Sequence, residues 1–261
     1  MKRFWLLACG LGALAAASAV FLQPEAHAES GSSESDGVRP KIIFFDVNET
    51  LLDLESMRAS VGEALDGRQE LLPLWFSTML HYSLVDSATG RYHNFGDIGV
   101  AALMMVAETN GVEITEREAR ESIVTPLRSL PPHPDVRAGL EALKKEGYTL
   151  VSLTNSSNSG VQTQFENAGL THFFDRRLSI EDIKLYKPHV ETYRWAAEQM
   201  GVRPEEAMMV AAHGWDIAGA KAAGMQAVFV ARPGKAQYAL GLPADHSVET
   251  ITELADWLGG D

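Results

Sequence analysis

Polar side chains that follow directly on short apolar runs are the first candidates for chemistry in this sequence. They are Asp46, Thr154, Asn155, His213 and Asp216, and Lys187 stands just before Pro188 at the start of a helical pattern. Carboxylate, hydroxyl, amide, imidazole and ammonium groups gathered in one place can bind a small polar molecule and act on it. Taken singly, each residue type is commoner as a helix cap, a turn or a helix start. Only their joint placement would therefore indicate a functional site.

The elements that must position these residues are predicted by hydrophobic patterning. Apolar runs at residues 41–45, 149–153, 207–211 and 226–230 are typical of strands buried on both faces. The helical patterns between them end at glycines suited to left-handed caps, Gly147, Gly169, Gly201 and Gly224. This alternation predicts an α/β fold with a Rossmann-like parallel sheet covered on both faces. Because ligands collect beyond the carboxyl ends of parallel strands, we expect the candidate residues to meet at one edge of the sheet.

Residues 54–130 have a different pattern. Apolar residues recur at helical spacing, as at Leu72, Trp75 and Met79, and no strand is evident. Short polar breaks at residues 86–90 and 110–115 divide the stretch into helices. We therefore expect a helical cap over residues 54–130, inserted after the first strand of a core formed by residues 41–53 and 131–261.

The N-terminal segment is typical of an exported protein. Lys2 and Arg3 precede an apolar run, and Ala26-His27-Ala28 has the small-x-small pattern of a cleavage site. This predicts a signal peptide at residues 1–28 and a disordered polar leader at residues 29–40. We expect a periplasmic protein with no stable membrane insertion after cleavage. Cys9 is the only cysteine, so the mature chain would have no disulfide, thiol nucleophile or zinc–thiolate site.

The charge balance bears on the kind of partner. The 261 residues include 22 Lys and Arg against 35 Asp and Glu, a net charge of −13. Such an acidic chain offers no general basic surface for nucleic acid. The expected partner is a small-molecule substrate.

Four segments in order resemble the motifs of the haloacid dehalogenase superfamily. They are Phe45-Asp46-Val47-Asn48-Glu49-Thr50-Leu51-Leu52, Leu153-Thr154-Asn155, Lys187-Pro188 and Trp215-Asp216. The predicted cap has the position of the cap in the dehalogenase-like branch of that superfamily. The segment from Trp215 to Ala220, together with Lys187 and Tyr193, looks most like the L-2-haloacid dehalogenases. The resemblance covers residues 41 to about 258.

The resemblance implies nucleophilic displacement at carbon. Asp46 would attack C2 of a small 2-substituted carboxylic acid and form an aspartyl ester, which water then hydrolyses to a 2-hydroxy acid of inverted configuration. By the same resemblance Lys187 holds Asp46 ionised and oriented, and Asp216 positions or activates water. Supporting or substrate-binding roles are implied for the side chains of Thr50, Thr154, Asn155 and Tyr193.

Departures from the superfamily's phosphatases argue against phosphoryl chemistry. Those enzymes have a second Asp two residues after the nucleophile, which protonates the leaving alkoxide, and Asn48 cannot donate a proton as an acid does. They also hold magnesium with an acidic pair in the fourth motif, where this chain has only Asp216. We therefore expect no metal and no cofactor, and a phosphatase is a weaker alternative.

Departures from the dehalogenases concern the leaving group. Phe76 stands where they have an arginine that holds the halide, Asn48 replaces a tyrosine, and His213 replaces an asparagine, with its role left open. A neutral amine leaving group would need no such cation. Because the chain also looks like the azetidine-2-carboxylate hydrolases, the leading hypothesis is ring opening of L-azetidine-2-carboxylate to 2-hydroxy-4-aminobutanoate. The alternative is an L-2-haloacid dehalogenase.

Three further expectations complete the interpretation. Phe76 and Trp215 are expected to face the substrate. A homodimer through the apolar cap helices is expected by resemblance alone. A non-catalytic exported binding protein is a further alternative, and the intact set of Asp46, Lys187 and Asp216 counts against it, since a binder needs no nucleophile.

Overall fold

The structure, a computed structural model, describes residues 39–260. The predicted signal peptide and nearly all of the predicted leader lie outside the described residues, so export stays a prediction. Arg39, at the end of that leader, is described. Its guanidinium donates to the Glu146 carbonyl at 2.8 Å and lies 4.5 Å from the centre of the Tyr148 ring. This end of the leader therefore packs on the core.

The described residues form a parallel sheet with the strand order β3-β2-β1-β4-β5-β6. The strands are β1 (Ile42–Phe45), β2 (Thr149–Thr154), β3 (Arg176–Ser179), β4 (Ala207–Ala211), β5 (Gln226–Val230) and β6 (His246–Val248). The central strand β1 is buried on both faces, as its unbroken apolar run Ile-Ile-Phe-Phe requires.

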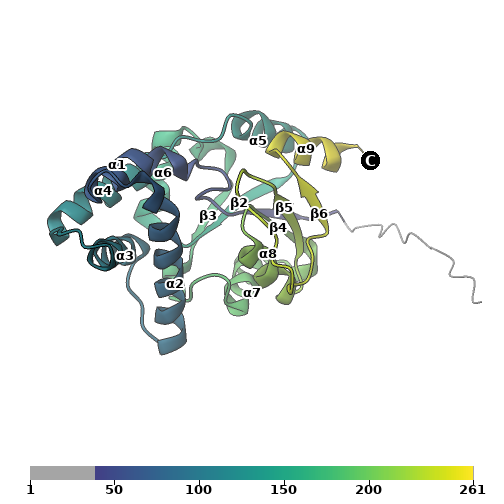
Figure 1. Cartoon of the computed structure of the whole chain (residues 1–261). Helices are drawn as coiled ribbons and strands as arrows, with labels where there is room; N and C mark the ends of the chain where they lie inside the picture. Colours follow the sequence, from purple (N-terminus) through teal and green to yellow (C-terminus); the bar gives the residue numbers. More distant parts are fainter. Residues whose placement is uncertain (1–38, 261) are drawn as a thin grey trace, which may run out of the picture. The chain divides into compact units, whose positions relative to one another are not determined.

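Helices cover both faces of the sheet (Figure 1). Ile43 and Phe45 belong to the apolar cluster with α5 (Val136–Lys145), α6 (Asn158–Ala168) and α9 (Ile251–Gly259). Ile42 and Phe44 belong to the opposite cluster, with α7 (Val190–Gln199) and α8 (Gly214–Ala222). This alternation follows from the two-residue period of a strand. The predicted α/β, Rossmann-like fold is confirmed.

Differences from the sequence prediction lie at the periphery of the sheet. The edge strands β3 (Arg-Arg-Leu-Ser) and β6 (His-Ser-Val) were not predicted, and neither was α9. Both strands are short, polar at their starts and lack an apolar run, which is how proteins protect sheet edges. The glycines expected after α5, α6, α7 and α8 have positive φ angles of 81°, 63°, 67° and 91°.

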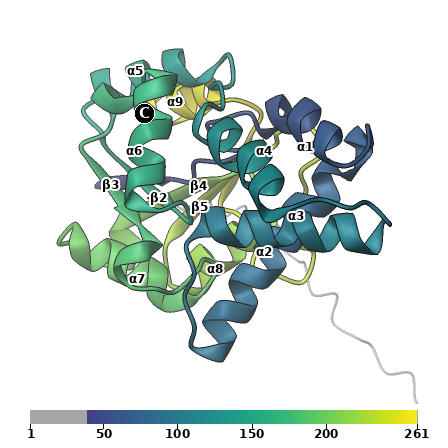
Figure 2. The ribbon, with the colours of Figure 1, turned by 90° about the vertical axis from the view of Figure 1, so that its left-hand side faces the viewer.

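The segment between β1 and β2 holds α1 (Arg58–Ala64), α2 (Leu72–Thr89), α3 (Phe95–Thr109) and α4 (Glu116–Arg128), with 3-10 turns at Leu54–Met57 and Gln69–Leu71. Figures 1 and 2 show α1–α4 gathered to one side of the sheet. Sequence-local caps start α3 and α4: Asn94 accepts from the Asp97 amide at 3.0 Å, and Thr115 forms a capping box with Glu118. The helices of the expected cap therefore form a group of their own.

Helix α2 has one buried and one exposed apolar face. Trp75, Phe76 and Met79 are buried, and the Trp75 indole donates to the Gly99 carbonyl of α3 at 2.8 Å. Large apolar side chains also remain exposed on α2, at Leu74, Tyr82, Leu84 and Val85. The homodimer expected through the cap stays a prediction. No helix within the described residues is long and apolar enough to cross a membrane.

Candidate active site

Asp46 stands directly after β1, at the carboxyl edge of the sheet. Its amide continues the pairing with β4 by donating to the Val210 carbonyl at 3.1 Å, so the sheet itself fixes the start of this loop. One carboxylate oxygen, Oδ2, accepts from the Thr50 hydroxyl at 2.7 Å, and the other, Oδ1, accepts from Lys187 Nζ at 2.9 Å. The Thr50 hydroxyl accepts in turn from the Ala212 amide at 2.9 Å. Asp46 is therefore buried and held from two sides.

Lys187 lies between two buried carboxylates. Its Nζ is 2.9 Å from Asp46 Oδ1 and 2.6 Å from Asp216 Oδ2, and its backbone amide donates to Asn155 Oδ1 at 3.1 Å. Burial by itself lowers the pKa of Lys187, but the charges of Asp216 and Asp46 outweigh it and raise that pKa. Burial likewise raises the pKa of Asp46, but Lys187, with His213 and Thr50, holds it well below its ordinary value. The ammonium and the Asp46 carboxylate are both charged at neutral pH.

Asp216 is held behind Asp46, in the first turn of α8. Its Oδ1 accepts from the Tyr193 hydroxyl of α7 at 2.5 Å, and both side chains are fully buried. Burial raises the pKa of Asp216, and the nearby charge of Asp46 raises it further. A Cβ atom on Gly219 would lie 2.6 Å from the Tyr193 hydroxyl, so the glycine in α8 is what lets the phenol reach this carboxylate.

His213 contacts the carboxylate oxygen of Asp46 that Lys187 does not. Its Nδ1 is 3.2 Å from Asp46 Oδ2 and its Nε2 is 2.7 Å from Glu49 Oε2, while the Lys235 ammonium pairs with the other oxygen of Glu49. Burial lowers the pKa of His213, but hydrogen bonds and charges from Asp46 and Glu49 outweigh it and raise that pKa to about 9. The ring is therefore an imidazolium at neutral pH, and both nitrogens donate.

A small cavity lies in front of Asp46, between the sheet edge and the cap. Its core side is lined by Asp46, Asn48, Thr154, Asn155, His213 and Trp215, and its cap side by Phe76, Leu80 and Phe95. The Trp215 ring stacks on His213 at 4.9 Å between centres, and the Phe76 ring lies 6.2 Å from His213. Four of the nine lining side chains are therefore rings. The cavity itself has a volume of only about 10 Å³, so a bound acid would also occupy the adjoining space.

The asparagine side chains in this wall, Asn48 and Asn155, differ in how many of their hydrogen-bonding atoms already have a partner. Asn48 Oδ1 accepts from Gln164 Nε2 at 2.8 Å, and Asn48 Nδ2 is 3.4 Å from the Ser156 hydroxyl. Asn155 uses its oxygen on the Lys187 amide, but its Nδ2 is buried without a hydrogen-bond partner within the described part of the chain. A buried donor without a partner is costly, so Asn155 is ready to donate to a bound substrate.

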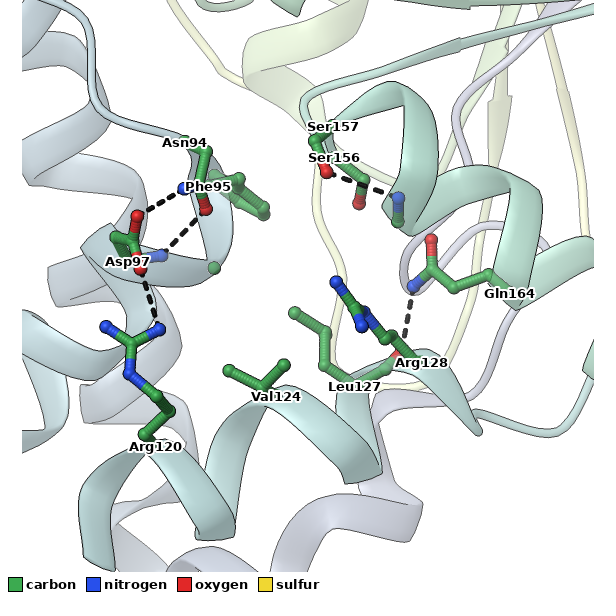
Figure 3. A pocket seen from close by; sticks show the side chains of 12 residues that line it. Asn94, Phe95, Asp97, Arg120, Val124, Leu127, Arg128, Ser156, Ser157 and Gln164 are labelled. Atoms are coloured by element: carbon green, nitrogen blue, oxygen red, sulfur yellow. Dashed lines mark hydrogen bonds and ion pairs between the residues drawn. The ribbon is translucent and has the colours of Figure 1, made fainter. Parts of the chain in front are cut away.

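Two larger cavities adjoin this one. A cavity of about 480 Å³ shares Phe76, Leu80 and His213 with it and also contacts Glu49 and Lys235. Another, of about 140 Å³, lies between the starts of α3 and α6 and helix α4 (Figure 3) and shares Phe95. In Figure 3, Gln164 and Leu127 are joined by a hydrogen bond at its wall, and the same Gln164 amide holds Asn48. The reactive cavity therefore has neighbouring space on both sides.

The structure brings every candidate residue of the sequence to this place. Those that line the cavity are Asp46, Asn48, Phe76, Thr154, Asn155, His213 and Trp215. Those that lie behind Asp46, joined to it directly or through Lys187, are Thr50, Lys187, Tyr193 and Asp216. Thr154 turns its hydroxyl toward the Ser156 amide at 3.1 Å. Phe76 and Trp215, expected to face the substrate, both line the wall.

Sequence reasoning missed Glu49 and Lys235. Glu49 is part of the first motif, and its closeness to Asp46 was a usable signal. Lys235 follows β5, and the rule that ligands collect beyond strand ends applies to β5 as it does to β1, β2 and β4. Within residues 39–260, no group of three or more His, Cys, Asp or Glu side chains is arranged to hold a metal ion.

Comparison with known proteins agrees with this geometry. The chain is 31% identical to (S)-2-haloacid dehalogenase 1 of Pseudomonas sp. (strain CBS-3), over 82% of this chain and 94% of the relative. It is 30% identical to haloacetate dehalogenase H-2 of Moraxella sp. (strain B), over 81% of this chain and 95% of that one. The L-2-haloacid dehalogenase from Xanthobacter autotrophicus superimposes with a TM-score of 0.79 at 27% identity, covering 85% of this chain and 99% of that chain.

The family match spans most of the fold. Residues 40–224 match the sequence pattern of the haloacid dehalogenase-like hydrolases, and these residues include β1 to β4, the segment between β1 and β2, and every candidate residue. The relatives are dehalogenases, and none of those named here is a ring-opening hydrolase. The chain belongs to the haloacid dehalogenase-like hydrolase family.

Proposed function

We propose that this enzyme hydrolyses a small 2-substituted carboxylic acid through an ester on Asp46. The observation that carries the proposal is the state of Asp46, an ionised carboxylate at the wall of a small cavity with Lys187 directly behind it. A buried carboxylate held in this way is poised to attack carbon, because it has lost most of the water that would weaken it as a nucleophile.

The wall of the cavity suits a small acid. The unpartnered Asn155 Nδ2 is a donor for the substrate carboxylate, and the positive charges of His213 and Lys187 offset the repulsion between that carboxylate and Asp46. The rings of Phe76, Phe95 and Trp215 exclude water around C2, which strengthens the electrostatic interactions that act during the displacement.

The first candidate substrate is an (S)-2-haloacid. The similar proteins with established names act on 2-haloacids or haloacetate, and a solved structure of the Xanthobacter relative contains chloropropionic acid covalently bound. In this chain the expelled halide would find the imidazolium of His213 as the one cationic side chain among the described residues that line the cavity. This reverses the order of the two hypotheses that the sequence alone supported.

The second candidate is L-azetidine-2-carboxylate, favoured by one observation. Phe76 is buried in the wall, and no arginine or lysine is among the described residues lining the cavity. An amine leaving group departs neutral and needs no cation, whereas removing a charged donor from a halide site costs about 10²–10³ in rate.

A direct assay separates the candidates. The purified protein is incubated, with chelator, with L-2-chloropropionate and separately with L-azetidine-2-carboxylate, and chloride, D-lactate and 2-hydroxy-4-aminobutanoate are measured. We expect chloride and D-lactate in equal amounts from the first substrate. Ring opening without chloride release would support the second candidate. No product from either substrate, in a protein shown to be folded, would contradict the proposed function.

A further inference from the structure

We infer that His213 is the general base that activates water in the second step, hydrolysis of the Asp46 ester, and that Glu49 is its positioning residue. The inference rests on the proposed function, since it needs the ester. The family resemblance gives this role to Asp216 instead. The two assignments differ in which side chain can reach a water molecule beside Asp46.

The contacts of Asp216 leave it poorly placed for water. Its Oδ1 accepts from Tyr193 and its Oδ2 from Lys187, its side chain has no exposed surface, and it does not line the cavity in front of Asp46. Its contacts fit another role, which is to hold the Lys187 ammonium against the nucleophile. A base must come within hydrogen-bond reach of the water it deprotonates.

The contacts of His213 place it at the cavity in front of Asp46, which Asp216 does not line. The ring lines the cavity, and its Nδ1 is 3.2 Å from Asp46 Oδ2. A water hydrogen-bonded to Nδ1 can therefore reach the carboxyl carbon of Asp46 in the ester. The Trp215 ring on one side and the Phe76 ring nearby fix the plane of the imidazole, and Glu49 Oε2 binds its far nitrogen at 2.7 Å.

Glu49 is held in a backbone conformation that is unusual for its type. Its φ angle is 66°, in the left-handed region that glycine adopts at little cost and a glutamate does not. The side chain compensates through hydrogen bonds with His213 and Lys235. A carboxylate on the far nitrogen of a histidine orients the ring and stabilises the imidazolium that forms when the near nitrogen takes a proton.

The charge on Asp46 determines whether His213 is protonated. The charged groups facing the ring are Asp46 and Glu49, with Lys235 behind Glu49 and Lys187 behind Asp46. While Asp46 is ionised, His213 is an imidazolium and cannot be a base. Ester formation neutralises Asp46 and removes its contribution to the raised pKa of His213. The histidine can then lose its proton at the stage at which a base is needed.

Protons and bonds balance over the cycle. In the first step an oxygen of Asp46 bonds to C2, the bond from C2 to the leaving group breaks, and the electron pair departs with that group. His213 then releases its proton, to solvent when halide leaves or to the expelled amine when the ring opens. Neutral His213 next takes a proton from water as the water oxygen bonds to the carboxyl carbon. The ester bond breaks, the alkoxide receives that proton, and the new carboxylic acid returns a proton to His213.

The larger neighbouring cavity places solvent beside the residues that support His213. His213, Glu49 and Lys235 all line this cavity of about 480 Å³, whereas Lys187 and Asp216 do not. Glu49 keeps a proton on Nε2 of His213, so the proton that the ring loses after ester formation is the one on Nδ1. That proton leaves through the cavity in front of Asp46, which adjoins the larger one at Phe76 and Leu80.

The test separates the two chemical steps. His213→Gln is mixed with L-2-chloropropionate, or with L-azetidine-2-carboxylate if the wild type acts on that compound, quenched in acid, and measured as intact protein by mass spectrometry. We expect ester hydrolysis to slow about 10²–10⁴-fold. Ester formation, which loses only the imidazolium beside the substrate, should slow by less, so that the ester accumulates. His213→Asn repeats the measurement in a second background. His172→Gln, the same substitution at an exposed residue of the turn Thr171–Phe173, is the matched control.

Glu49→Gln tests the positioning role through the pH profile. The amide keeps a hydrogen-bond acceptor but removes the charge, so the pKa of His213 falls. We expect the inflection in the pH dependence of ester hydrolysis to move to lower pH by about one unit or more. A loss of packing alone would lower the rate without moving the inflection.

Several outcomes would overturn the inference. Ester hydrolysis at the wild-type rate in a folded His213 variant would do so, as would an ester that accumulates in Asp216→Asn instead. An unshifted pH profile in Glu49→Gln would remove Glu49 from the mechanism. If the wild type itself gives neither ester nor product from either substrate, the proposed function fails first, and the inference fails with it.

Discussion

The two sides of Asp46 are built in different ways. The inner side consists of Thr50, Lys187, Tyr193 and Asp216, which are buried and use their polar atoms on one another and on Asp46. The outer side is the cavity wall with its support, where Asn48, Phe76 and His213 meet space and Glu49 and Lys235 stand behind His213. The residues of the inner side match the family pattern, and those that depart from it are on the outer side.

This division separates two tasks. The inner side holds the nucleophile, and the outer side borders the space for the leaving group and the attacking water. A nucleophilic carboxylate needs the same support whatever the leaving group is, so the inner side does not specify the substrate. In the proposed mechanism, the leaving group and the attacking water would contact the outer side. Substitutions on the two sides should therefore have different effects: inner ones should abolish the first step, and outer ones should change substrate preference or the second step.

The largest effect is expected from removing the nucleophile. Asp46→Asn leaves the cavity in place but replaces the attacking oxygen by an amide, so turnover should fall by at least about 10⁴-fold, because nothing else can form the ester. Product assays and intact mass spectrometry check this, and the variant should show no ester. Substrate turnover above about one-hundredth of the wild-type rate would mean that water attacks carbon directly.

The next largest effect is expected at Lys187. Lys187→Met leaves two buried carboxylates, Asp46 and Asp216, without their shared cation. Breaking a buried ion pair in this way typically destabilises a protein by about 3–5 kcal/mol, and urea unfolding measures the loss. The pKa of Asp46 should rise, so any residual activity should fall off at higher pH on the acid side than in the wild type. An unchanged unfolding midpoint would contradict the assigned contacts.

The fold was predictable where hydrophobic burial dictates sequence. Strands β1, β2, β4 and β5 lie inside the sheet and are buried on both faces, so each contains a run of mainly apolar residues, although Ser152 interrupts the run in β2. The edge strands β3 and β6 pair on one side only and carry polar residues such as Arg176 and His246. No periodic signal distinguishes three or four such residues from a loop.

The same reasoning explains which part of the site was predictable. The inner side comes from strand ends and helix starts, whose positions the pattern gives. The contact between Glu49 and Lys235 joins residues 186 positions apart, and Lys235 lies on a loop without periodicity. The left-handed backbone that turns Glu49 toward His213 has no sequence signature, because glycine is the residue that usually marks it. Positions near strand ends therefore indicated where these residues lie, but only tertiary proximity brings Lys235, Glu49 and His213 into contact.

On the outer side, Phe76 offers a test of the leaving-group preference. Phe76→Arg places a guanidinium where the wall is aromatic, and the adjoining cavity of about 480 Å³ gives the longer side chain room. We expect chloride release from L-2-chloropropionate to rise by about 10²-fold, since a cation stabilises a departing anion, and ring opening of azetidine-2-carboxylate not to rise. Phe76→Leu, which stays apolar, is the control. Equal chloride release by the two variants would show that His213 already supplies the needed charge.

The smallest effect is expected in the pH dependence of the free energy of unfolding. This dependence reports on the charge of His213, which belongs to the outer side. The pKa of His213 is raised to about 9 in the folded protein from an ordinary value of 6.5. Its pairing with Asp46 and Glu49 therefore contributes stability that is fully present below pH 6.5 and is lost as the pH rises through 9. Asp46 and Glu49 stay ionised throughout, because their pKa values are lowered. The loss should be on the order of 1–3 kcal/mol.

Thermal or urea unfolding of the wild type and His213→Gln from pH 6 to pH 9.5 measures this contribution as a difference. Lysines and tyrosines that titrate near the upper limit are common to both proteins and cancel. The difference in unfolding free energy should shrink as the pH rises, because the variant has no imidazolium to lose. A constant difference would mean that His213 is neutral in the folded enzyme. The ring could then act as a base before the ester forms, and the charge on Asp46 would no longer set the order of the two steps.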